Sequence, residues 1–162
     1  MNLNPSNQIY LYEHKKIFEI LLNFYKNIGS SSKIILSGEK GIGKSTLAYH
    51  IINYELSKSE KDAYDYDKNK INVKNNSYKL IQNKSNPNFH LLDIAIDKKS
   101  IDINQVRVLI NSLNKSSFNN KQRFVLIDNI ELLNLNSVNA LLKIIEEPNE
   151  NIHFILINNN KK

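Results

Sequence analysis

The chain contains no cysteine and no tryptophan, and it has only four glycines and three prolines among 162 residues. The absence of cysteine excludes a disulfide scaffold and any zinc site built on thiolates. No stretch approaches about 18 consecutive apolar residues, the length of a membrane-spanning helix. The segment Met1 to Pro5 lacks a basic region followed by an apolar run, so it predicts no signal peptide. We therefore expect a soluble, cytoplasmic protein with neither zinc nor a membrane span.

Arginine is also scarce. Only Arg107 and Arg123 occur among the 22 basic residues, and 16 acidic residues leave a formal net charge of +6. A positive balance suits a partner that carries phosphates, but a lysine-rich composition produces the same excess. The sequence has no dense arginine patch for DNA, and we interpret the lysines from Lys58 to Lys84 as a flexible surface.

The apolar pattern predicts alternating helices and strands. Buried strands are expected at 33–37, 89–94, 123–127 and 153–157, and helices at about 13–28, 47–56, 102–113 and 138–147. Apolar strands separated by helices indicate an α/β fold with a mainly parallel sheet that is flanked by helices. The polar residues at about 57–88 are nearly free of periodicity, so we expect an insertion that could contain a short helix.

Two helices carry more specific predictions. In the first, helical spacing predicts an apolar face made of Ile17, Ile20, Leu21, Phe24, Tyr25 and Ile28. In the third, Asp102 and Gln105 have the spacing of a capping box, which marks the start of a helix. The spacing of Val138, Leu141, Leu142 and Ile145 predicts the last helix, which Pro148 terminates.

Residues Gly38 to Ser45 match G-x-x-x-x-G-K-[ST] between a predicted strand and a predicted helix, the context of a phosphate-binding P-loop. Glycines let the backbone N–H groups turn towards phosphate oxygens, and the helix that follows adds the positive end of its dipole. Three of the four glycines fall within six residues, which favours this interpretation over a plain turn. The expected nucleotide-binding residues are Gly38, Glu39, Lys40, Gly41, Ile42, Gly43, Lys44, Ser45 and Thr46.

Individual side chains of this loop have separate roles. We expect Lys44 to contact the terminal phosphates, and to face solvent when no nucleotide is bound. The Ser45 hydroxyl is expected to bind Mg²⁺, and Asp128, at the end of the 123–127 strand, to hold Mg²⁺ through water. The next residue is Asn129, which cannot take a proton from water, and Glu131 lies two residues further on. No catalytic residue is therefore certain.

Polar residues also follow the last strand. Within Asn158 to Asn160, we take Asn159 as the side chain that could contact the γ-phosphate, although a plain loop explains it nearly as well. The four histidines, His14, His50, His90 and His153, share no metal-ligand spacing. Surface or core packing is the better interpretation of them.

The segment from Asn139 to Pro148, Asn-Ala-Leu-Leu-Lys-Ile-Ile-Glu-Glu-Pro, resembles a signature of bacterial clamp-loader AAA+ domains. The segments 102–109, 4–14 and 41–49 resemble the same family, most of all the delta-prime subunits of DNA polymerase III. The resemblance covers nearly the whole chain. It implies a three-layer P-loop NTPase fold that binds ATP and Mg²⁺ and helps to load the sliding clamp onto primed DNA. The implied partners are gamma/tau-like and delta-like subunits.

Several departures from the family pattern narrow the expectation. Gamma/tau relatives carry four zinc-binding cysteines and an Asp-Glu pair, where this chain has no cysteine and has Asp128-Asn129. Both departures favour a delta-prime-like subunit with weak or absent ATP hydrolysis. The sequence ends shortly after the strand that precedes Asn159. We therefore expect residues 1–162 to be a partial AAA+ domain, without lid or collar and monomeric on its own.

Two alternatives stay open. A catalytic gamma/tau-like ATPase that lost its zinc module is the runner-up, and it would hydrolyse ATP. A small-molecule P-loop kinase is a distant third, because no arginine-rich lid is apparent.

Overall fold

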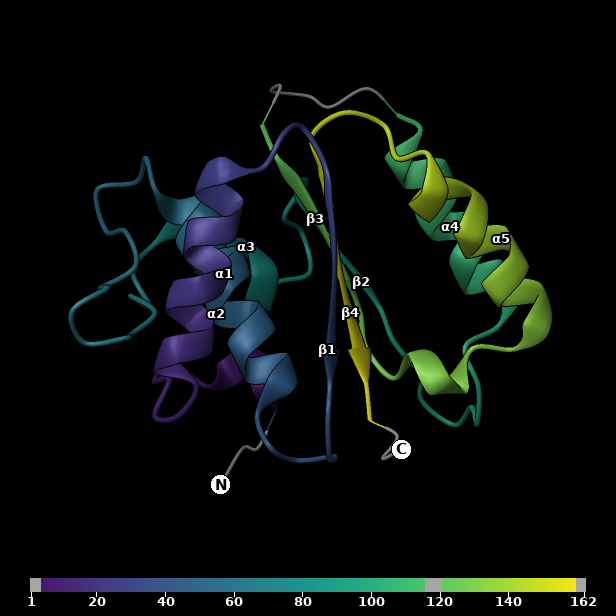
Figure 1. Cartoon of the computed structure of the whole chain (residues 1–162), viewed down its shortest axis with the longest axis horizontal. Coiled ribbons are helices and arrows are strands. Elements are labelled where there is room, and N and C mark those ends of the chain that lie inside the picture. Colours follow the sequence, from purple (N-terminus) through teal and green to yellow (C-terminus); the bar gives the residue numbers. More distant parts are fainter. Residues whose placement is uncertain (1–3, 116–120, 160–162) are drawn as a thin grey trace. The chain divides into compact units, whose positions relative to one another are not determined.

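The computed structural model describes residues 4–115 and 121–159. It contains a parallel sheet of β1 (Ser32–Ser37), β2 (Phe89–Leu92), β3 (Arg123–Ile127) and β4 (Ile152–Asn158). The helices are α1 (Lys15–Asn27), α2 (Lys44–Ser57), α3 (Asn76–Gln82), α4 (Ile103–Leu113) and α5 (Leu135–Glu146), with short 3₁₀ turns η1 (Pro5–Asn7) and η2 (Ile130–Leu132). The predicted α/β fold with a parallel sheet is confirmed (Figure 1).

The chain divides into two compact units that alternate along the sequence. We call Met1–Ile28 with Gly41–Asn86 the helical unit, and Gly29–Lys40 with Pro87–Lys162 the sheet unit. The predicted P-loop contributes to both, because the boundary falls between Lys40 and Gly41. Across the described residues, no helix is both long enough and apolar enough to cross a bilayer.

The sheet unit has the strand order β1-β4-β3-β2, so the two most apolar strands are central. Every residue of β3 is buried, as are most residues of β4. Both faces of a central parallel strand are covered, which explains why these segments are continuous apolar runs without polar alternation. The four predicted strands are confirmed, each to within two residues at either end.

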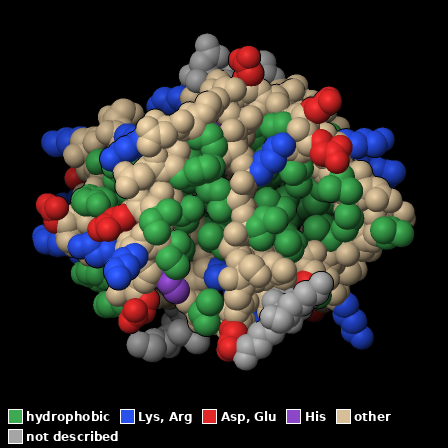
Figure 2. Space-filling model, viewed as in Figure 1, with side chains coloured by type: hydrophobic (Ala, Val, Ile, Leu, Met, Phe, Trp, Pro, Cys, Tyr) green, Lys and Arg blue, Asp and Glu red, His purple; other side chains and the backbone are tan. Residues whose placement is uncertain are grey.

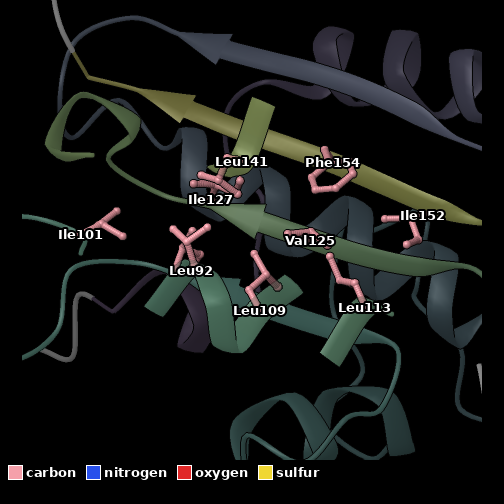
Figure 3. Packing of buried hydrophobic residues seen from close by; sticks show 10 residues of the cluster. Leu92, Ile101, Leu109, Leu113, Val125, Ile127, Leu141, Ile152 and Phe154 are labelled. Atoms are coloured by element: carbon pink, nitrogen blue, oxygen red, sulfur yellow. The ribbon is translucent and has the colours of Figure 1, made fainter. Parts of the chain in front are cut away.

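Helices α4 and α5 lie side by side against one face of this sheet (Figure 1). Side chains from both helices meet those of β3 and β4 in one apolar cluster (Figure 3), which includes Leu109, Leu113, Val125, Leu141 and Phe154. The predicted capping box at the start of α4 is confirmed, with Asp102 and Gln105 bonded to each other's backbone N–H groups. The predicted last helix is confirmed as α5, in which Leu141 is buried and Leu142 is 45% exposed.

In the helical unit, the predicted apolar face of α1 is confirmed at Tyr25 and wrong at Ile17 and Ile20. Phe18, Leu22 and Tyr25 are buried, whereas Ile17 and Ile20 are 44% and 65% exposed. The reason is an aromatic cluster, in which the ring of Phe18 lies 5.5–6.4 Å from three tyrosine rings, those of Tyr54, Tyr64 and Tyr66. The helix carries apolar residues on two sides, and long-range aromatic contacts decide which side is buried.

The predicted insertion contains the short helix α3, but it is not loosely attached. The backbone of the insertion forms an antiparallel bridge with the N-terminal segment, in which Lys70 pairs with Tyr10. The Asn53 and Asn75 side-chain amides donate to each other, at 3.3 and 3.1 Å. Such pairings between segments far apart in sequence leave no periodic apolar pattern, which is why the segment resembled a loop.

A buried histidine joins three parts of the helical unit. His50, on α2, donates through Nε2 to the Gln8 carbonyl at 3.0 Å and accepts at Nδ1 from the Tyr64 hydroxyl at 2.8 Å. Burial lowers the pKa of His50 to about 4, so the imidazole is neutral near pH 7. His153, on β4, is also buried, and it stacks on Phe124. The packing interpretation of these two histidines is confirmed.

Acid is expected to destabilise the helical unit through His50. Between pH 6.5 and about 4, the unfolded chain binds a proton at this imidazole and the folded chain does not, so stability falls as pH falls through this window. The free energy of unfolding should drop by about 1 kcal/mol between about pH 6 and pH 5 from this group alone.

Urea denaturation of wild type and His50→Gln at these two pH values measures the effect. The loss should be smaller in the variant, since the other histidines with lowered pKa, His90 and His153, are present in both proteins. An equal loss in both proteins would show that His50 titrates normally in the folded state.

Candidate nucleotide-binding site

All four strands run parallel, so their carboxyl ends lie at one edge of the sheet. The residues that directly follow them are Gly38, Asp93, Asp128 and Asn159. The Gly38 N–H donates to the Asn158 carbonyl at 3.3 Å, which fixes the start of the P-loop beside the end of β4. Ligands of open parallel sheets bind at this edge, outside the carboxyl ends of the strands. Three of the predicted site residues, Gly38, Asp128 and Asn159, lie at this edge.

The second half of the P-loop belongs to the helical unit and leads into α2. Gly41 and Gly43 have φ values of +88° and +93°, which residues with a β-carbon rarely adopt. Gly43 is the N-cap of α2, and its carbonyl accepts from the Leu47 N–H at 2.9 Å. Lys44, Ser45 and Thr46 form the first turn of α2, where backbone N–H groups have no acceptor within the helix. This is a donor arrangement that suits an anion.

One expectation about the loop is wrong. Lys44 does not face solvent, because it is only 7% exposed. By contrast, Glu39, Lys40 and Gly41 are exposed, and Ile42 is 45% exposed. Burial restricts the conformations that the Lys44 side chain can adopt before any ligand binds. Loss of this side chain therefore affects packing as well as charge.

The structure brings three predicted site residues of the sheet unit together. The Asn159 side chain donates to Asn129 Oδ1 at 2.9 Å, and the Asn159 backbone N–H donates to Glu131 Oε2 at 3.1 Å. Asn129 adopts a left-handed conformation at φ 56°, and its backbone N–H donates to the Asp128 carboxylate at 2.9 Å. Asn160, also in the predicted asparagine run, lies outside the described residues.

Asp93, at the end of β2, is a member of this site that the sequence did not predict. Its carboxylate accepts from the Asn129 amide at 2.8 Å, and its carbonyl accepts from the Gln105 side chain at 2.8 Å. The side chains of Asp93, Asn129 and Asn159 therefore form a hydrogen-bonded chain, which we call the strand-end chain. The sequence missed it because the predicted strand, 89–94, extended past Asp93, whereas β2 ends at Leu92.

The arrangement of possible metal ligands and of basic side chains gives little further evidence about this site. In the described ranges, no group of three or more His, Cys, Asp or Glu side chains is placed to hold a metal ion. Magnesium at a P-loop needs few protein ligands, and the oxygens of Ser45 and Asp128 are of the type it prefers. Basic side chains on the face drawn in Figure 2 lie apart from one another or beside acidic ones. That face shows no dense basic patch.

Comparison with known proteins agrees with the resemblance. The family model described as "DNA polymerase III, delta subunit" matches residues 13–162. The delta-prime subunit of DNA polymerase III from Buchnera aphidicola subsp. Baizongia pistaciae is 34% identical over 98% of this chain and 45% of its own length. The gamma subunit from Buchnera aphidicola subsp. Acyrthosiphon pisum is 32% identical over 75% of this chain and 31% of its own length.

A solved structure shares the fold. The gamma subunit-related protein of DNA polymerase III from Thermotoga maritima superposes with a TM-score of 0.54, at 19% identity, over 87% of this chain and 38% of its own. The chain spans less than half the length of these relatives. Because the family model covers almost all of the sequence, the chain belongs to the DNA polymerase III delta-subunit family.

Proposed function

We propose that this chain is the nucleotide-binding part of a delta-prime-like clamp-loader subunit, which binds Mg²⁺-ATP and hydrolyses it slowly or not at all. Its proposed partners are gamma/tau-like and delta-like subunits, the sliding clamp and, through the complex, primed DNA. A subunit of the replicative polymerase works on the chromosome, so we place it in the cytoplasm. Membership of the DNA polymerase III delta-subunit family supports the proposed partners, and the P-loop that leads into α2 supports the proposed nucleotide binding.

Each part of the loop has a proposed role in holding the nucleotide. Backbone N–H groups between Gly41 and Ser45 would surround the phosphates, and the Lys44 ammonium would contact the terminal ones. The Ser45 hydroxyl and Asp128 would hold Mg²⁺, directly and through water. Bound magnesium would neutralise phosphate charge.

The observation that carries the proposal of weak hydrolysis is the strand-end chain. Asn129 occupies the sequence position, directly after Asp128, at which related ATPases have a glutamate, and both ends of its amide are bonded, to Asp93 and Asn159. An amide cannot accept a proton from water at neutral pH. Bound nucleotide would therefore influence how the subunits of the assembly are arranged, while a partner subunit hydrolyses its own ATP.

A catalytic gamma-like ATPase is the second candidate, because the chain is 32% identical to a gamma subunit over 75% of its length. Glu131 or Asp93 would then have to act as the base. Co-purification with gamma/tau-like subunits from the same source, with hydrolysis measured before and after mixing, tests the proposal. Assembly without intrinsic hydrolysis is expected. Fast hydrolysis by the chain alone would favour the second candidate, and failure to assemble would contradict the proposed partners.

A further inference from the structure

His14 contacts the P-loop although it lies 28 residues before it in the sequence. Its ring Nε2 is 2.5 Å from the carbonyl oxygen of Ile42. A carbonyl only accepts, so the Nε2–H of His14 is the donor. The same ring lies against the next residue: a β-carbon on Gly43 would be 3.3 Å from Nε2 and 3.5 Å from Cδ2. His14 therefore bonds to the carbonyl of one peptide unit, Ile42–Gly43, and its ring lies near Gly43 of the same unit.

The position of the His14 ring is fixed from both directions along the chain. On one side, Leu11 is buried and its N–H donates to the Asn69 carbonyl at 3.0 Å. On the other side, the His14 carbonyl accepts from the Phe18 N–H at 2.8 Å, and Phe18 anchors α1 in the aromatic cluster. All these groups belong to the helical unit, as do Ile42 and Gly43. The donor is thus held in place before any ligand arrives.

The orientation of this peptide unit decides whether the loop can bind an anion. The carbonyl and N–H of a trans peptide point in opposite directions, and no described peptide is cis. A bond that holds the Ile42 carbonyl on the His14 side therefore turns the Gly43 N–H the other way. The glycine at φ +93° offers little resistance to a flip of this peptide unit, so a bond to its carbonyl selects one of two accessible orientations.

We propose that His14 is a positioning residue for the phosphate loop, which holds the Ile42–Gly43 peptide so that the Gly43 N–H is directed at a bound phosphate. This inference rests on the proposed nucleotide-binding function. A hydrogen bond to the carbonyl also polarises the peptide and strengthens the N–H as a donor. Without it, only a fraction of the molecules has the binding-competent loop, and the apparent affinity falls by that fraction.

The test compares two variants of the full chain that differ in one respect. His14→Gln keeps a side-chain N–H of similar reach, and His14→Leu keeps bulk without a donor. Neither variant introduces a β-branched residue at this left-handed position, φ 66°, so backbone strain is similar in both. In calorimetric titrations with Mg²⁺-ATP, His14→Leu should bind about 2- to 12-fold more weakly than wild type. His14→Gln should stay within about twofold of wild type.

Two results would overturn the proposal: wild-type affinity in His14→Leu, or equal weakening in both variants, which would indicate packing alone. Lys44→Ala serves as the separate test of the site itself. If wild type and Lys44→Ala bind Mg²⁺-ATP equally, the proposed nucleotide site fails whatever His14 does.

Nuclear magnetic resonance decides the peptide orientation without any nucleotide. Labelling isoleucine carbonyls with ¹³C and glycine nitrogens with ¹⁵N selects only two peptide units in this sequence, Ile28–Gly29 and Ile42–Gly43. The Ile42–Gly43 signal should shift or broaden in His14→Leu and stay near its wild-type position in His14→Gln. The Ile28–Gly29 signal, at the opposite end of α1, is the internal control. An unchanged Ile42–Gly43 signal in His14→Leu would refute the positioning role.

Discussion

Replacing Lys44 with alanine is expected to weaken binding of Mg²⁺-ATP by about 10- to 150-fold. Lys44 is 7% exposed and is the first residue of α2, directly after the loop. A hydrogen bond to a charged group is worth about 1.5–3 kcal/mol, and removing the cation removes that contact to the terminal phosphates. Calorimetric titration of wild type and variant with Mg²⁺-ATP measures the difference.

Because Lys44 is buried, a second variant separates charge from packing. Lys44→Met keeps an apolar stem of similar length and removes only the ammonium group. Its affinity should fall nearly as far as that of Lys44→Ala, while its urea denaturation stays close to that of wild type. Lys79→Ala removes one exposed lysine from α3 and should bind as wild type does. Equal affinities of Lys44→Met and Lys79→Ala would show that Lys44 does not contact phosphate.

Placing a carboxylate at position 129, next to Asp128, is expected to destabilise the protein and to leave ATP hydrolysis low unless Asp93 is changed as well. The Asn129 amide donates to the Asp93 carboxylate at 2.8 Å, so Asn129→Glu replaces a donor with a second carboxylate. Two like charges at this distance repel each other, and the bond to Asp93 is lost. We expect Asn129→Glu to be about 1–3 kcal/mol less stable than Asn129→Gln, which has the same length and the same unfavourable left-handed backbone.

The double variant Asp93→Asn/Asn129→Glu exchanges the acid and the amide without changing net charge. The amide introduced at position 93 can donate to the carboxylate introduced at position 129, so most of the lost stability should return. ATP hydrolysis, measured with the clamp-loader partners present, should rise in the double variant and not in Asn129→Glu. Equal stability of Asn129→Glu and Asn129→Gln would show that the contact with Asp93 does not contribute to the stability of the fold.

The sequence predicted the sheet well because its strands are continuous apolar runs with clear ends. The limits of β3, 123–127, agree at both ends, and a polar residue directly follows the strand at Asp128. The capping box at Asp102 was equally clear, since it depends on residues only three positions apart. Local patterns of this kind need no knowledge of tertiary contacts.

Several of the errors involve contacts between distant segments. The buried face of α1 depends on Phe18 meeting Tyr64, which lies in the insertion. His14 appeared only as one of four histidines without metal-ligand spacing, and its partner is a backbone carbonyl that no side-chain pattern reveals. Asp93 lay inside the strand predicted at 89–94, so its position directly after the shorter strand β2 was not apparent. Pairing it with Asn129 required the register of β2 and β3.

The central claim is that the chain binds ATP at its P-loop and hardly hydrolyses it. Incubation of the purified chain with labelled ATP and Mg²⁺, followed by separation of bound nucleotide, tests both halves in one measurement. We expect the bound label to be recovered as ATP, with turnover far below the range of about 1–10³ s⁻¹ that is typical of enzymes. Absence of bound nucleotide, or turnover within that range, would contradict the account.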